Sequence, residues 1–316
     1  MSQIHWMKGR LLASQPLARD IRGLTLQPAE GSYPAFSSGS HLLLRAGSSA
    51  DSPVNAYSLL DASYEGNSLH IAVKREASAR GGSAWLHGLQ PGAGLEFTTP
   101  ANLFALQPGA ASFLFIAGGI GITPFIAHMA AMRGRVQDFQ LHYAYRSAAE
   151  AAFVEELAGR ASVRLYDASQ GTRLDVAALL AGVGATSHVY ACGPQRLIAA
   201  VEAAGQDLAQ QGRLHIERFA PPDSPAGAEF VLQLARSGCE VRVAADESML
   251  DAIQRQTAIR VESLCREGYC GTCETRLLAG TALHRDQYLS GAEQAVQDRV
   301  MLCVSRAACE RLVLDL

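Results

Sequence analysis

The alternation of apolar and polar residues gives the first 104 residues a strand-like rhythm. Short apolar runs are separated by spacers rich in Gly, Ser, Asp and Asn, which favour turns. We expect strands around residues 21–26, 41–46, 56–60 and 69–75. Several short strands at this spacing predict a small antiparallel β-barrel.

From residue 105 the rhythm changes, because apolar strand-like runs now alternate with helical patterns. The expected strands are 112–118, 140–146, 163–167, 187–193 and 214–219. The expected helices are 124–132, 148–159, 175–182 and 195–211. Strands that alternate with helices predict a parallel, doubly wound α/β sheet.

A third region follows Pro221–Ala228, whose Pro, Ser, Gly and Ala content is typical of a linker. Beyond it we expect a helix at 248–256 and a cysteine-rich loop. Further strand-like runs are 230–238, 239–246, 274–280, 300–307 and 311–316. We therefore divide the chain into domains 1–104 and 105–222, a linker 223–228, and a domain 229–316.

Composition and charge narrow the function. The 316 residues carry a net charge of −3, so no basic excess points to nucleic acid or an anionic membrane. Phe97–Met132 lacks Asp, Glu, Lys and Arg, but prolines and glycines interrupt it, which favours a buried strand–loop–helix over a membrane span. The first 22 residues contain no apolar signal region, and we expect a cytoplasmic protein.

Four of the seven cysteines have the spacing of a metal site. Cys265, Cys270 and Cys273 form C-x4-C-x2-C, and Cys303 follows 30 positions later. This is the spacing of a plant-type [2Fe–2S] cluster, and soft thiolates suit iron in a sulfide cluster. Structural zinc usually takes two short knuckles, and a thioredoxin-like pair needs no third or fourth cysteine. The odd cysteine count also argues against a disulfide framework.

Two loops of the second region have the residues expected at a dinucleotide. Gly118, Gly119, Gly121 and Thr123 follow an apolar strand and open a helix, for which Thr123 is the expected N-cap; this suits a pyrophosphate. The alternative is a glycine turn of packing value alone. A later strand ends in Cys192-Gly193-Pro194, where ligands of parallel sheets bind; Cys192 alone fits a buried packing residue equally well.

Two weaker motifs lie in the first region. One is Tyr57-Ser58 on an expected strand. The other joins Ala72-Val73-Lys74 to Gly81-Gly82-Ser83, where Gly-Gly-Ser opens a helix as a phosphate cradle does.

Taken in order, these motifs resemble the phthalate dioxygenase reductase family, including the vanillate demethylase reductases. The motifs are AYS, AVKR, RGGS, GGIGITP, YACGP, CREGYCGTC, HRD and CVSR, and they span nearly the whole chain. The resemblance implies an FMN-binding barrel, an NADH-binding α/β domain and a β-grasp ferredoxin domain. It also implies a monomer that contacts its partner transiently.

The resemblance also implies residue roles. Tyr57, Ser58 and residues 72–74 would lie along the flavin, and residues 81–83 would hold its phosphate. Residues 118–123 and 192–194 would frame the nicotinamide, with Phe219 near the flavin. Ser58 near flavin N5 and Cys192 near nicotinamide C4 are the expected catalytic pair.

Three positions leave questions open. Asn55 stands where the family commonly has Arg, a bidentate donor that Asn cannot replace. Leu264 stands where a Ser hydroxyl often precedes the first cluster cysteine. Arg146, with Ser147, has the chemistry to hold a 2′-phosphate, so the sequence leaves NADH and NADPH both open.

The predicted function is the reductase component of a two-component, Rieske-type oxygenase. Electrons would pass from NADH through FMN and [2Fe–2S] to the oxygenase singly. The alternatives are another acceptor, such as a cytochrome P450 or a ferric chelate, and a flavin and iron–sulfur redox sensor. Residues 229–316 hold 13 acidic residues, 10 arginines and no lysine, which favours a partner with basic character.

Overall fold

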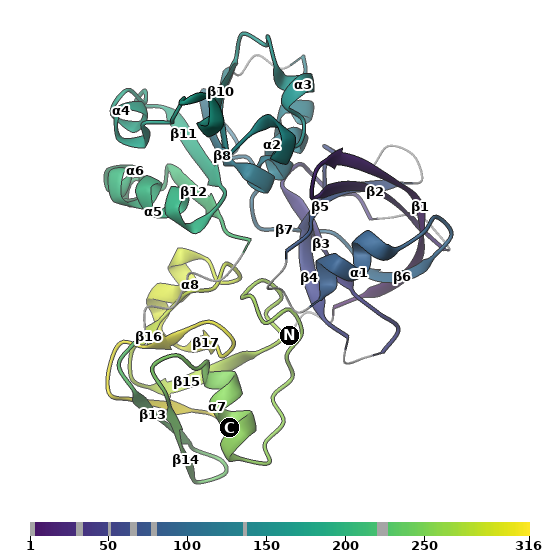
Figure 1. The fold of residues 1–316 in the computed structure, drawn as a ribbon. Helices are drawn as coiled ribbons and strands as arrows, with labels where there is room; N and C mark the ends of the chain where they lie inside the picture. The colour runs from purple at the N-terminus through teal and green to yellow at the C-terminus, as the bar shows by residue number, and fades with distance from the viewer. Residues whose placement is uncertain are drawn as a thin grey trace. The chain divides into compact units, whose positions relative to one another are not determined.

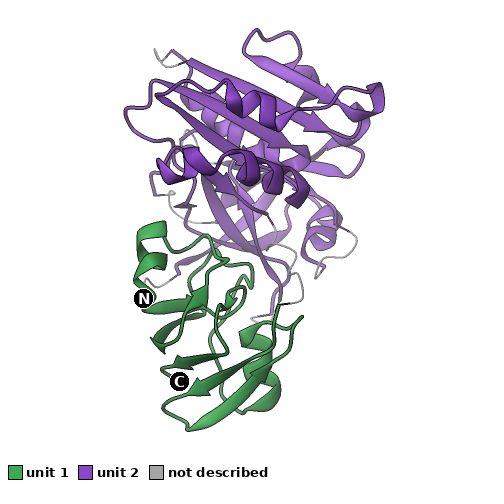
Figure 2. Cartoon of the chain, turned by 90° about the vertical axis from the view of Figure 1, so that its left-hand side faces the viewer, with its two compact units in different colours: residues 1, 220–316 green, residues 2–219 purple. Residues whose placement is uncertain are grey.

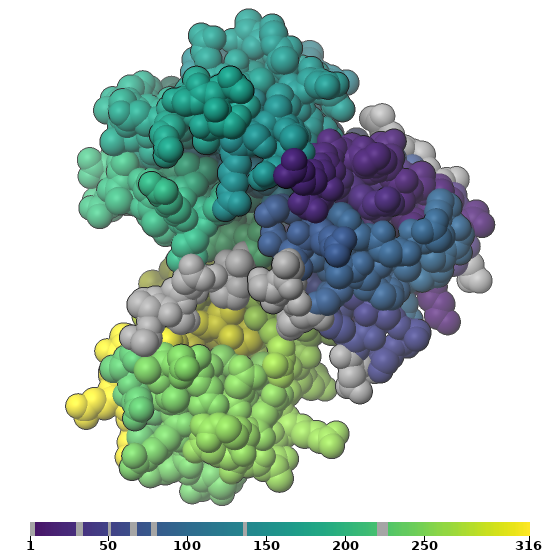
Figure 3. Space-filling model, viewed as in Figure 1, coloured from purple at the N-terminus to yellow at the C-terminus, as the bar shows by residue number. Residues whose placement is uncertain are grey.

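A computed structural model describes residues 4–29, 34–49, 52–63, 68–76, 81–134, 138–219 and 227–316. The remaining residues are drawn in grey (Figure 3). The chain forms two compact units, residues 2–219 and residues 220–316 (Figure 2). Most of the linker predicted at 223–228 lies outside the described residues, and the predicted domain boundaries stay predictions. No helix in the described ranges is long and apolar enough to cross a membrane.

The predicted antiparallel barrel forms the first part of the larger unit (Figure 1). The strands are β1 Trp6–Ala18, β2 Ile21–Pro28, β3 Ser40–Arg45, β4 Val54–Ser58, β5 Leu69–Lys74, β6 Gly94–Thr98 and β7 Ala101–Asn102. Their order is β4-β3-β6-β1-β2-β5, with β7 beside β3. A bridge between Leu59 and Ile71 joins the two ends of this order, so the sheet closes on itself. Helix α1, Gly82–Gly88, follows β5.

The second part of the larger unit is the predicted parallel sheet, in the order β10-β9-β8-β11-β12. The strands are β8 Ser112–Gly118, β9 Asp138–Tyr145, β10 Val163–Asp167, β11 Ser187–Cys192 and β12 Leu214–Glu217. The α-helices are α2 Thr123–Ala131, α3 Val154–Leu157, α4 Val176–Ala181, α5 Gln195–Ala204 and α6 Gln206–Gln210. The strand order reverses between β8 and β11, so the crevice expected for a ligand lies at their carboxyl ends.

Three local predictions in this sheet domain were wrong. Residues 148–159 form a 3₁₀ turn, η2 Ala148–Glu150, and the short α3, because Phe153 adopts a left-handed φ of 64° between them. Residues 195–211 form two helices that separate at Gly205. Thr123 begins α2 and does not cap it, since its hydroxyl donates to the carbonyl of Ile120 in the 3₁₀ turn η1, Gly119–Ile122.

The smaller unit contains a mixed five-stranded sheet in the order β14-β13-β19-β15-β17 and a separate pair, β16 and β18. The strands are β13 Phe230–Leu234, β14 Cys239–Val243, β15 Glu274–Ala279, β16 Ala282–Leu283, β17 Arg299–Met301, β18 Arg306–Ala307 and β19 Arg311–Leu314. Helix α7, Met249–Gln256, packs on this sheet as the predicted β-grasp requires. The strand expected at 300–307 is instead divided into β17 and β18 by a turn that carries Cys303.

Two of the elements that the hydrophobic pattern did not predict bury few of their residues. Strand β1 buries only Gly9 and Leu11 along its length. Helix α8, Gly291–Val296, buries none of its residues and begins with a capping box between Ser290 and Glu293.

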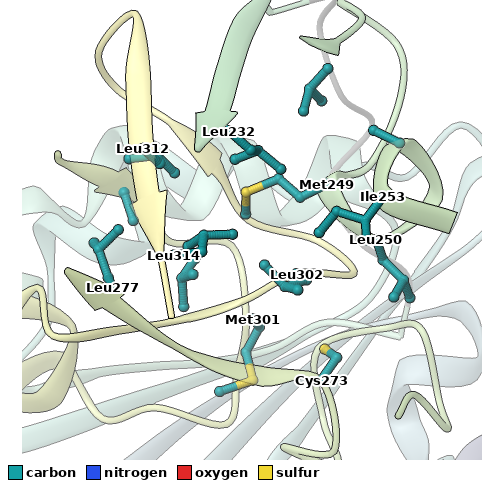
Figure 4. Packing of buried hydrophobic residues seen from close by; sticks show 14 of the residues in the cluster. Leu232, Met249, Leu250, Ile253, Cys273, Leu277, Met301, Leu302, Leu312 and Leu314 are labelled. Carbon is teal, nitrogen blue, oxygen red and sulfur yellow. The ribbon is translucent and has the colours of Figure 1, made fainter. Parts of the chain in front are cut away.

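The core of the smaller unit supports the cysteine loop. Leu232, Met249, Leu312 and Leu314 come from β13, α7 and β19 and pack in one buried cluster (Figure 4). Cys273 belongs to the same cluster, and Cys303 packs against it. The loop between α7 and β15 is therefore anchored in the core at one end.

Candidate functional site

The cysteine loop of the smaller unit directs hydrogen-bond donors at its sulfur atoms. The backbone N–H groups of Glu267 and Tyr269 each donate to Cys265 Sγ at 3.4 Å. The hydroxyl of Thr272 donates to Cys270 Sγ at 3.2 Å. Thr272 thus supplies a hydroxyl donor to a sulfur of the candidate cluster site, whereas Leu264 has no hydroxyl, and the cysteine spacing did not predict this role of Thr272.

The four thiols sort into two pairs. Cys265 hydrogen-bonds to Cys270, which raises the pKa of Cys265 and lowers that of Cys270. Cys273 and Cys303 form the second pair, in which hydrogen bonding and burial raise the pKa of Cys303. Within the described ranges, no three His, Cys, Asp or Glu side chains gather around a single ion position. Two pairs suit the two irons of a Cys₄ cluster.

Two glycines bring the loop close to its neighbours. Gly271 has a φ of +71°, and a Cβ there would lie 2.3 Å from the ring of Tyr288. Gly268 has a φ of +79°, and its Cβ would lie 3.0 Å from Cα of Asp286. Asp286 is buried and accepts a hydrogen bond from the N–H of Leu289. The His284-Arg285-Asp286 motif therefore packs against the cysteine loop.

The flavin motifs converge at one end of the barrel. Tyr57 and Ser58 end β4, and the bridge from Leu59 to Ile71 places them beside β5, which carries Ala72, Val73 and Lys74. A hydrogen bond from the N–H of Glu76 to Ser83 Oγ, 3.1 Å long, brings the Gly81-Gly82-Ser83 turn to the end of β5. The sequence predicted these motifs separately, and the fold brings them together.

Two details of this convergence bear on a flavin. Ser58 Oγ is buried, and none of the described residues hydrogen-bonds to it. A buried hydroxyl without a partner is costly, so its position fits a bound group with a polar edge. Asn55 lies against the cradle, because a Cβ on Gly82 would come within 2.3 Å of its Oδ1. The Nζ of Lys74 pairs with Glu76 at 2.7 Å on the surface next to this site.

The two predicted nicotinamide loops touch each other at the crevice of the parallel sheet. A Cβ on Gly121 would lie 2.3 Å from the carbonyl oxygen of Cys192. A Cβ on Gly118 would lie 2.6 Å from Cδ of Pro194, and one on Gly193 would meet Gly118 at 2.9 Å. The glycines therefore permit a close approach of two backbone segments, and any side chain would separate them.

The flavin and nicotinamide motifs also adjoin. Ala72 of β5, Ile21 and Ala152 form one buried cluster, and Ile120 of the glycine loop packs against it. A hydrogen bond of 3.0 Å between His128 Nδ1 and Ser38 Oγ joins the parallel-sheet domain to the barrel. Within this unit, residues from the flavin strand and from the nucleotide loop thus share one packing cluster.

Glu217 is a site residue that the sequence analysis did not single out. It pairs with Cys192 across β11 and β12, and both side chains are buried. Burial raises the pKa of Glu217 to about 8, and burial with the Glu217 carboxyl beside it raises the pKa of Cys192. Cys192 is therefore a thiol and not a thiolate at neutral pH. The alternation of Leu214, His215, Ile216 and Glu217 was the available signal, since it places Glu217 on the face of Cys192.

Two predicted site residues lie outside the flavin and nicotinamide clusters described above. Phe219 follows β12, exposes 36% of its surface and makes no recorded contact with the flavin motifs in the described part of the chain. Arg146 is exposed after β9. Asp167 ends the neighbouring β10, and its carboxylate accepts hydrogen bonds from the N–H and hydroxyl of Ser169. These donors hold the pKa of Asp167 below its usual value.

Comparison with known proteins places both units in one family. Residues 232–308 match the family described as a 2Fe-2S iron-sulfur cluster binding domain. The chain is 45% identical over 323 residues to the carnitine monooxygenase reductase subunit of Escherichia coli (strain K12), with 100% of each chain covered. It also matches the crystal structure of phthalate dioxygenase reductase with a TM-score of 0.70 and 32% identity, over 98% of both chains.

A larger protein shares the same architecture. An intact type IV self-sufficient cytochrome P450 monooxygenase matches with a TM-score of 0.80 and 36% identity over 98% of this chain. This chain spans only 41% of that protein.

Proposed function

The chain belongs to the family of oxygenase reductase subunits that includes phthalate dioxygenase reductase, and we propose that it passes electrons from NADH, through FMN and a [2Fe–2S] cluster, to a Rieske-type oxygenase. The observation that carries the proposal is that one chain combines two different kinds of candidate site, each in its own unit. One unit joins flavin and nucleotide motifs in a common packing cluster, and the other holds two cysteine pairs.

The bound cofactors supply the redox chemistry, accepting a hydride and releasing its electrons one at a time. The protein's own residues position them. Ser58 is the buried donor for the flavin edge, residues 72–74 line the flavin, and residues 81–83 with Asn55 form the phosphate cradle. The glycine loop and residues 192–194 would hold the nicotinamide, and Phe219 stays the aromatic that the family resemblance assigns to the flavin.

Cys192 and Glu217 act on the nicotinamide side through their neutral forms. Because both pKa values are raised, the neutral forms of both side chains are favoured. Cys192 shapes the site beside nicotinamide C4, and Glu217 holds Cys192 through their hydrogen bond. Neither residue is required as a proton-transfer catalyst.

We assign NADH as the donor because of Asp167. The side chain ends β10, next to the end of β9, where Arg146 lies, and the N–H of Ser169 donates to the Arg146 carbonyl at 2.9 Å. A carboxylate at this sheet edge accepts ribose hydroxyls and repels a 2′-phosphate, which offsets the attraction of Arg146. Comparing kcat/KM for NADH and NADPH tests this choice. A preference for NADPH in the native protein would contradict it.

The acceptor is the oxygenase component of the same system. A reductase does not bind the organic substrate of its oxygenase, so the substrate names of its relatives do not transfer to this chain. The likeness to a self-sufficient cytochrome P450 favours a P450 haem as the second candidate acceptor. The monomeric state is also part of this proposal, and gel filtration of the holoprotein checks it.

The primary experiment is a visible spectrum of the purified protein, with chromatography of the released flavin and NADH-dependent reduction of cytochrome c and ferricyanide. We expect FMN, two iron atoms per chain and steady turnover with both acceptors. Absence of iron or of flavin bands would refute the proposal. Bound cofactors without turnover would favour a redox sensor.

A further inference from the structure

Phe153 is a bulky aromatic residue whose backbone is left-handed, with a φ of 64° and a ψ of 10°. This conformation brings the Cβ of an L-residue too close to the following carbonyl oxygen. Among the described residues, Arg266 and Gln297 are the other non-glycine residues with a positive φ, and neither is aromatic. A strained backbone persists where the surrounding structure enforces it, and such residues are concentrated at functional sites.

The left-handed residue separates two short elements. The 3₁₀ turn η2 ends at Glu150, and α3 begins at Val154. The N–H of Leu157 donates to the carbonyl of Phe153 at 3.0 Å, which closes the first turn of α3. With a helical φ at Phe153, residues 148–159 would continue as the single helix that their sequence predicts. The strained φ therefore sets the direction in which the ring of Phe153 leaves the backbone.

The residues just before Phe153 are attached to the barrel. The N–H of Arg19, in the turn between β1 and β2, donates to the carbonyl of Ala149 at 2.9 Å. One buried cluster, called the junction cluster from here on, consists of Ile21, Ala72 and Ala152. Because Ala72 lies on β5, along which we place the flavin, this segment of the sheet domain meets the barrel at the flavin strand.

The ring of Phe153 packs against the junction cluster and also against the core of the parallel sheet. Ile120 of the glycine loop packs against the junction cluster as well. The sheet core contains Ile122, from the same loop, and Cys192, from the second nicotinamide loop. Of the described apolar residues that border these two clusters, Phe153 alone borders both. A single side chain thus links the packing of the flavin strand to the packing of both nicotinamide loops.

Resting on the proposed function, we propose that Phe153 is a positioning residue for hydride transfer from NADH to the flavin. In this step the C4–H bond of NADH breaks, and its hydrogen and two electrons form an N–H bond at flavin N5, so NADH is oxidised as the flavin is reduced. Phe153 acts through Ala72 and Ile120, against whose cluster its ring packs. The left-handed backbone holds the ring in this position.

The spacing of the two loops and the flavin strand has a kinetic consequence. Hydride transfer needs reacting atoms about 3–3.5 Å apart, so a small change of spacing has a large effect on rate. The barrel and the parallel sheet carry the two reactants on separate elements of one unit. Because protein interiors are close-packed, removal of a ring between such elements lets them shift.

The test uses the full-length holoprotein under anaerobic conditions, with NADH mixed in a stopped-flow instrument. In Phe153→Ala we expect the rate of flavin reduction at saturating NADH to fall about tenfold, which is less than the loss caused by a displacement of 1 Å. The NADH concentration that gives half of the maximal rate should stay within about twofold of the native value, because the loops themselves are intact. A change confined to that concentration would assign Phe153 to NADH binding and overturn the proposal.

The second measurement involves no turnover. When NAD⁺ binds to photoreduced protein, stacking of the nicotinamide on the flavin produces a long-wavelength charge-transfer absorbance. We expect this absorbance to be weaker in Phe153→Ala at saturating NAD⁺, while the affinity of the apoprotein for FMN, measured by fluorescence quenching, stays native. A native charge-transfer band in Phe153→Ala would show that the spacing is unchanged and would overturn the role of Phe153.

Phe139→Ala is the matched control. Phe139 is also half-buried and packs against the sheet core, where its ring stacks on Phe115 with centroids 5.7 Å apart, but it lies outside the set that borders the junction cluster. Its loss should leave the rate and the charge-transfer band unchanged. Equal slowing in Phe139→Ala and Phe153→Ala would assign the effect to general loss of packing and overturn the proposal.

Two further variants keep the test decisive. Phe153→Tyr keeps the ring and should reduce its flavin within about twofold of the native rate. If Phe153→Ala does not retain its flavin, Phe153→Leu takes its place, because it keeps an apolar side chain and removes the ring. Native rate and band in Phe153→Leu would then overturn the role of the ring.

The failure of the proposed function can be told apart from the failure of this inference. Native protein whose flavin is not reduced by NADH would refute the proposed function itself. Native protein that is reduced as expected, with the same rate and charge-transfer band in Phe153→Ala, would refute only the role of Phe153.

Discussion

Three of the four cysteines that we propose as cluster ligands lie within residues 265–273, whereas the flavin and nicotinamide motifs come from segments spread between residues 55 and 219. In the loop, the sulfurs receive hydrogen bonds from the intervening residues themselves, as from Glu267 and Tyr269. In the larger unit, the contacts that define the site join strands distant in sequence, as between Gly121 and Cys192. A site formed by one loop can therefore be recognised from the spacing of its residues in the sequence. A site formed by segments that are distant in sequence depends on the fold that brings them together.

The largest expected effect would be loss of the cysteine site with no change at the flavin and nicotinamide site. Cys303→Ser removes one of the two thiolates of its pair, so we expect loss of cluster absorbance and a fall of about 100-fold or more in cytochrome c reduction. Flavin reduction by NADH should persist at the native rate in stopped-flow measurements. Cys309→Ser, at an exposed cysteine outside the ligand spacing, is the control. If Cys303→Ser also abolishes flavin reduction, the two sites are not independent.

The convergent site should be the more sensitive to a single methyl group. Gly121→Ala places a Cβ 2.3 Å from the backbone of Cys192 and forces the two loops apart. We expect the rate of flavin reduction by NADH to fall by about 100-fold, because a displacement near 1 Å is enough for such a loss. Gly182→Ala is the control, and it should not change the rate of flavin reduction, because the nearest atom to a Cβ there is 3.7 Å away. A native rate in Gly121→Ala would show that the loops need not touch.

Removing the hydroxyl of Ser58, to which none of the described residues hydrogen-bonds, should have a smaller effect. Ser58→Ala deletes a donor that we place at the flavin edge, and the loss of one buried hydrogen bond predicts a decrease of about tenfold in flavin reduction. Cluster absorbance should be unaffected. Ser14→Ala, at a hydroxyl bonded to Arg22 on the barrel surface, is the control. Equal activity of Ser58→Ala and native protein would remove Ser58 from the site.

Glu217 predicts a dependence of stability on pH. Its folded pKa of about 8 exceeds the ordinary 4.5, so the folded state binds the proton more tightly than the unfolded state. Its contribution is complete below pH 4.5 and is lost as the pH rises through 8. Between pH 6 and pH 8 the loss is about 2 kcal/mol. Glu217→Gln should remove this component.

The measurement for Glu217 is the thermal unfolding midpoint of the native protein and of Glu217→Gln at pH 6 and pH 8. The native midpoint should fall more steeply with pH than that of the variant. Parallel pH profiles would show that Glu217 ionises normally in the fold. The cysteine loop provides the comparison, since Cys303→Ser should not alter the difference between the two profiles.

The smallest effect concerns the surface of the smaller unit. Residues 229–316 carry the net charge of the whole chain, with 13 acidic residues against 10 arginines. We expect the rate of association with the oxygenase to fall by a few-fold between low and physiological salt, because screening weakens attraction to a basic partner. Flavin reduction by NADH provides the internal reference. An association rate indifferent to ionic strength would contradict the charge argument.

The sequence was most informative where a short segment carries its own signal. The cysteine spacing, the apolar run of β8 and the alternation of strands with helices predicted the cysteine loop and the parallel sheet. It was least informative where burial is sparse. Strand β1 buries only two residues, and α8 buries none, so neither has a hydrophobic pattern to find. Phe153 interrupts a predicted helix because it adopts a left-handed conformation, and it packs against two buried clusters.

By itself, the sequence determined the chemistry that each segment can perform: thiolates at cluster spacing, glycines at loops and small polar residues along two strands. Only the tertiary structure decided which of these segments meet. The pairing of Cys192 with Glu217 and the packing of Ala152 with Ala72 join residues that are distant in the chain. Such contacts depend on strand register and on the packing of whole elements, so local sequence pattern does not encode them.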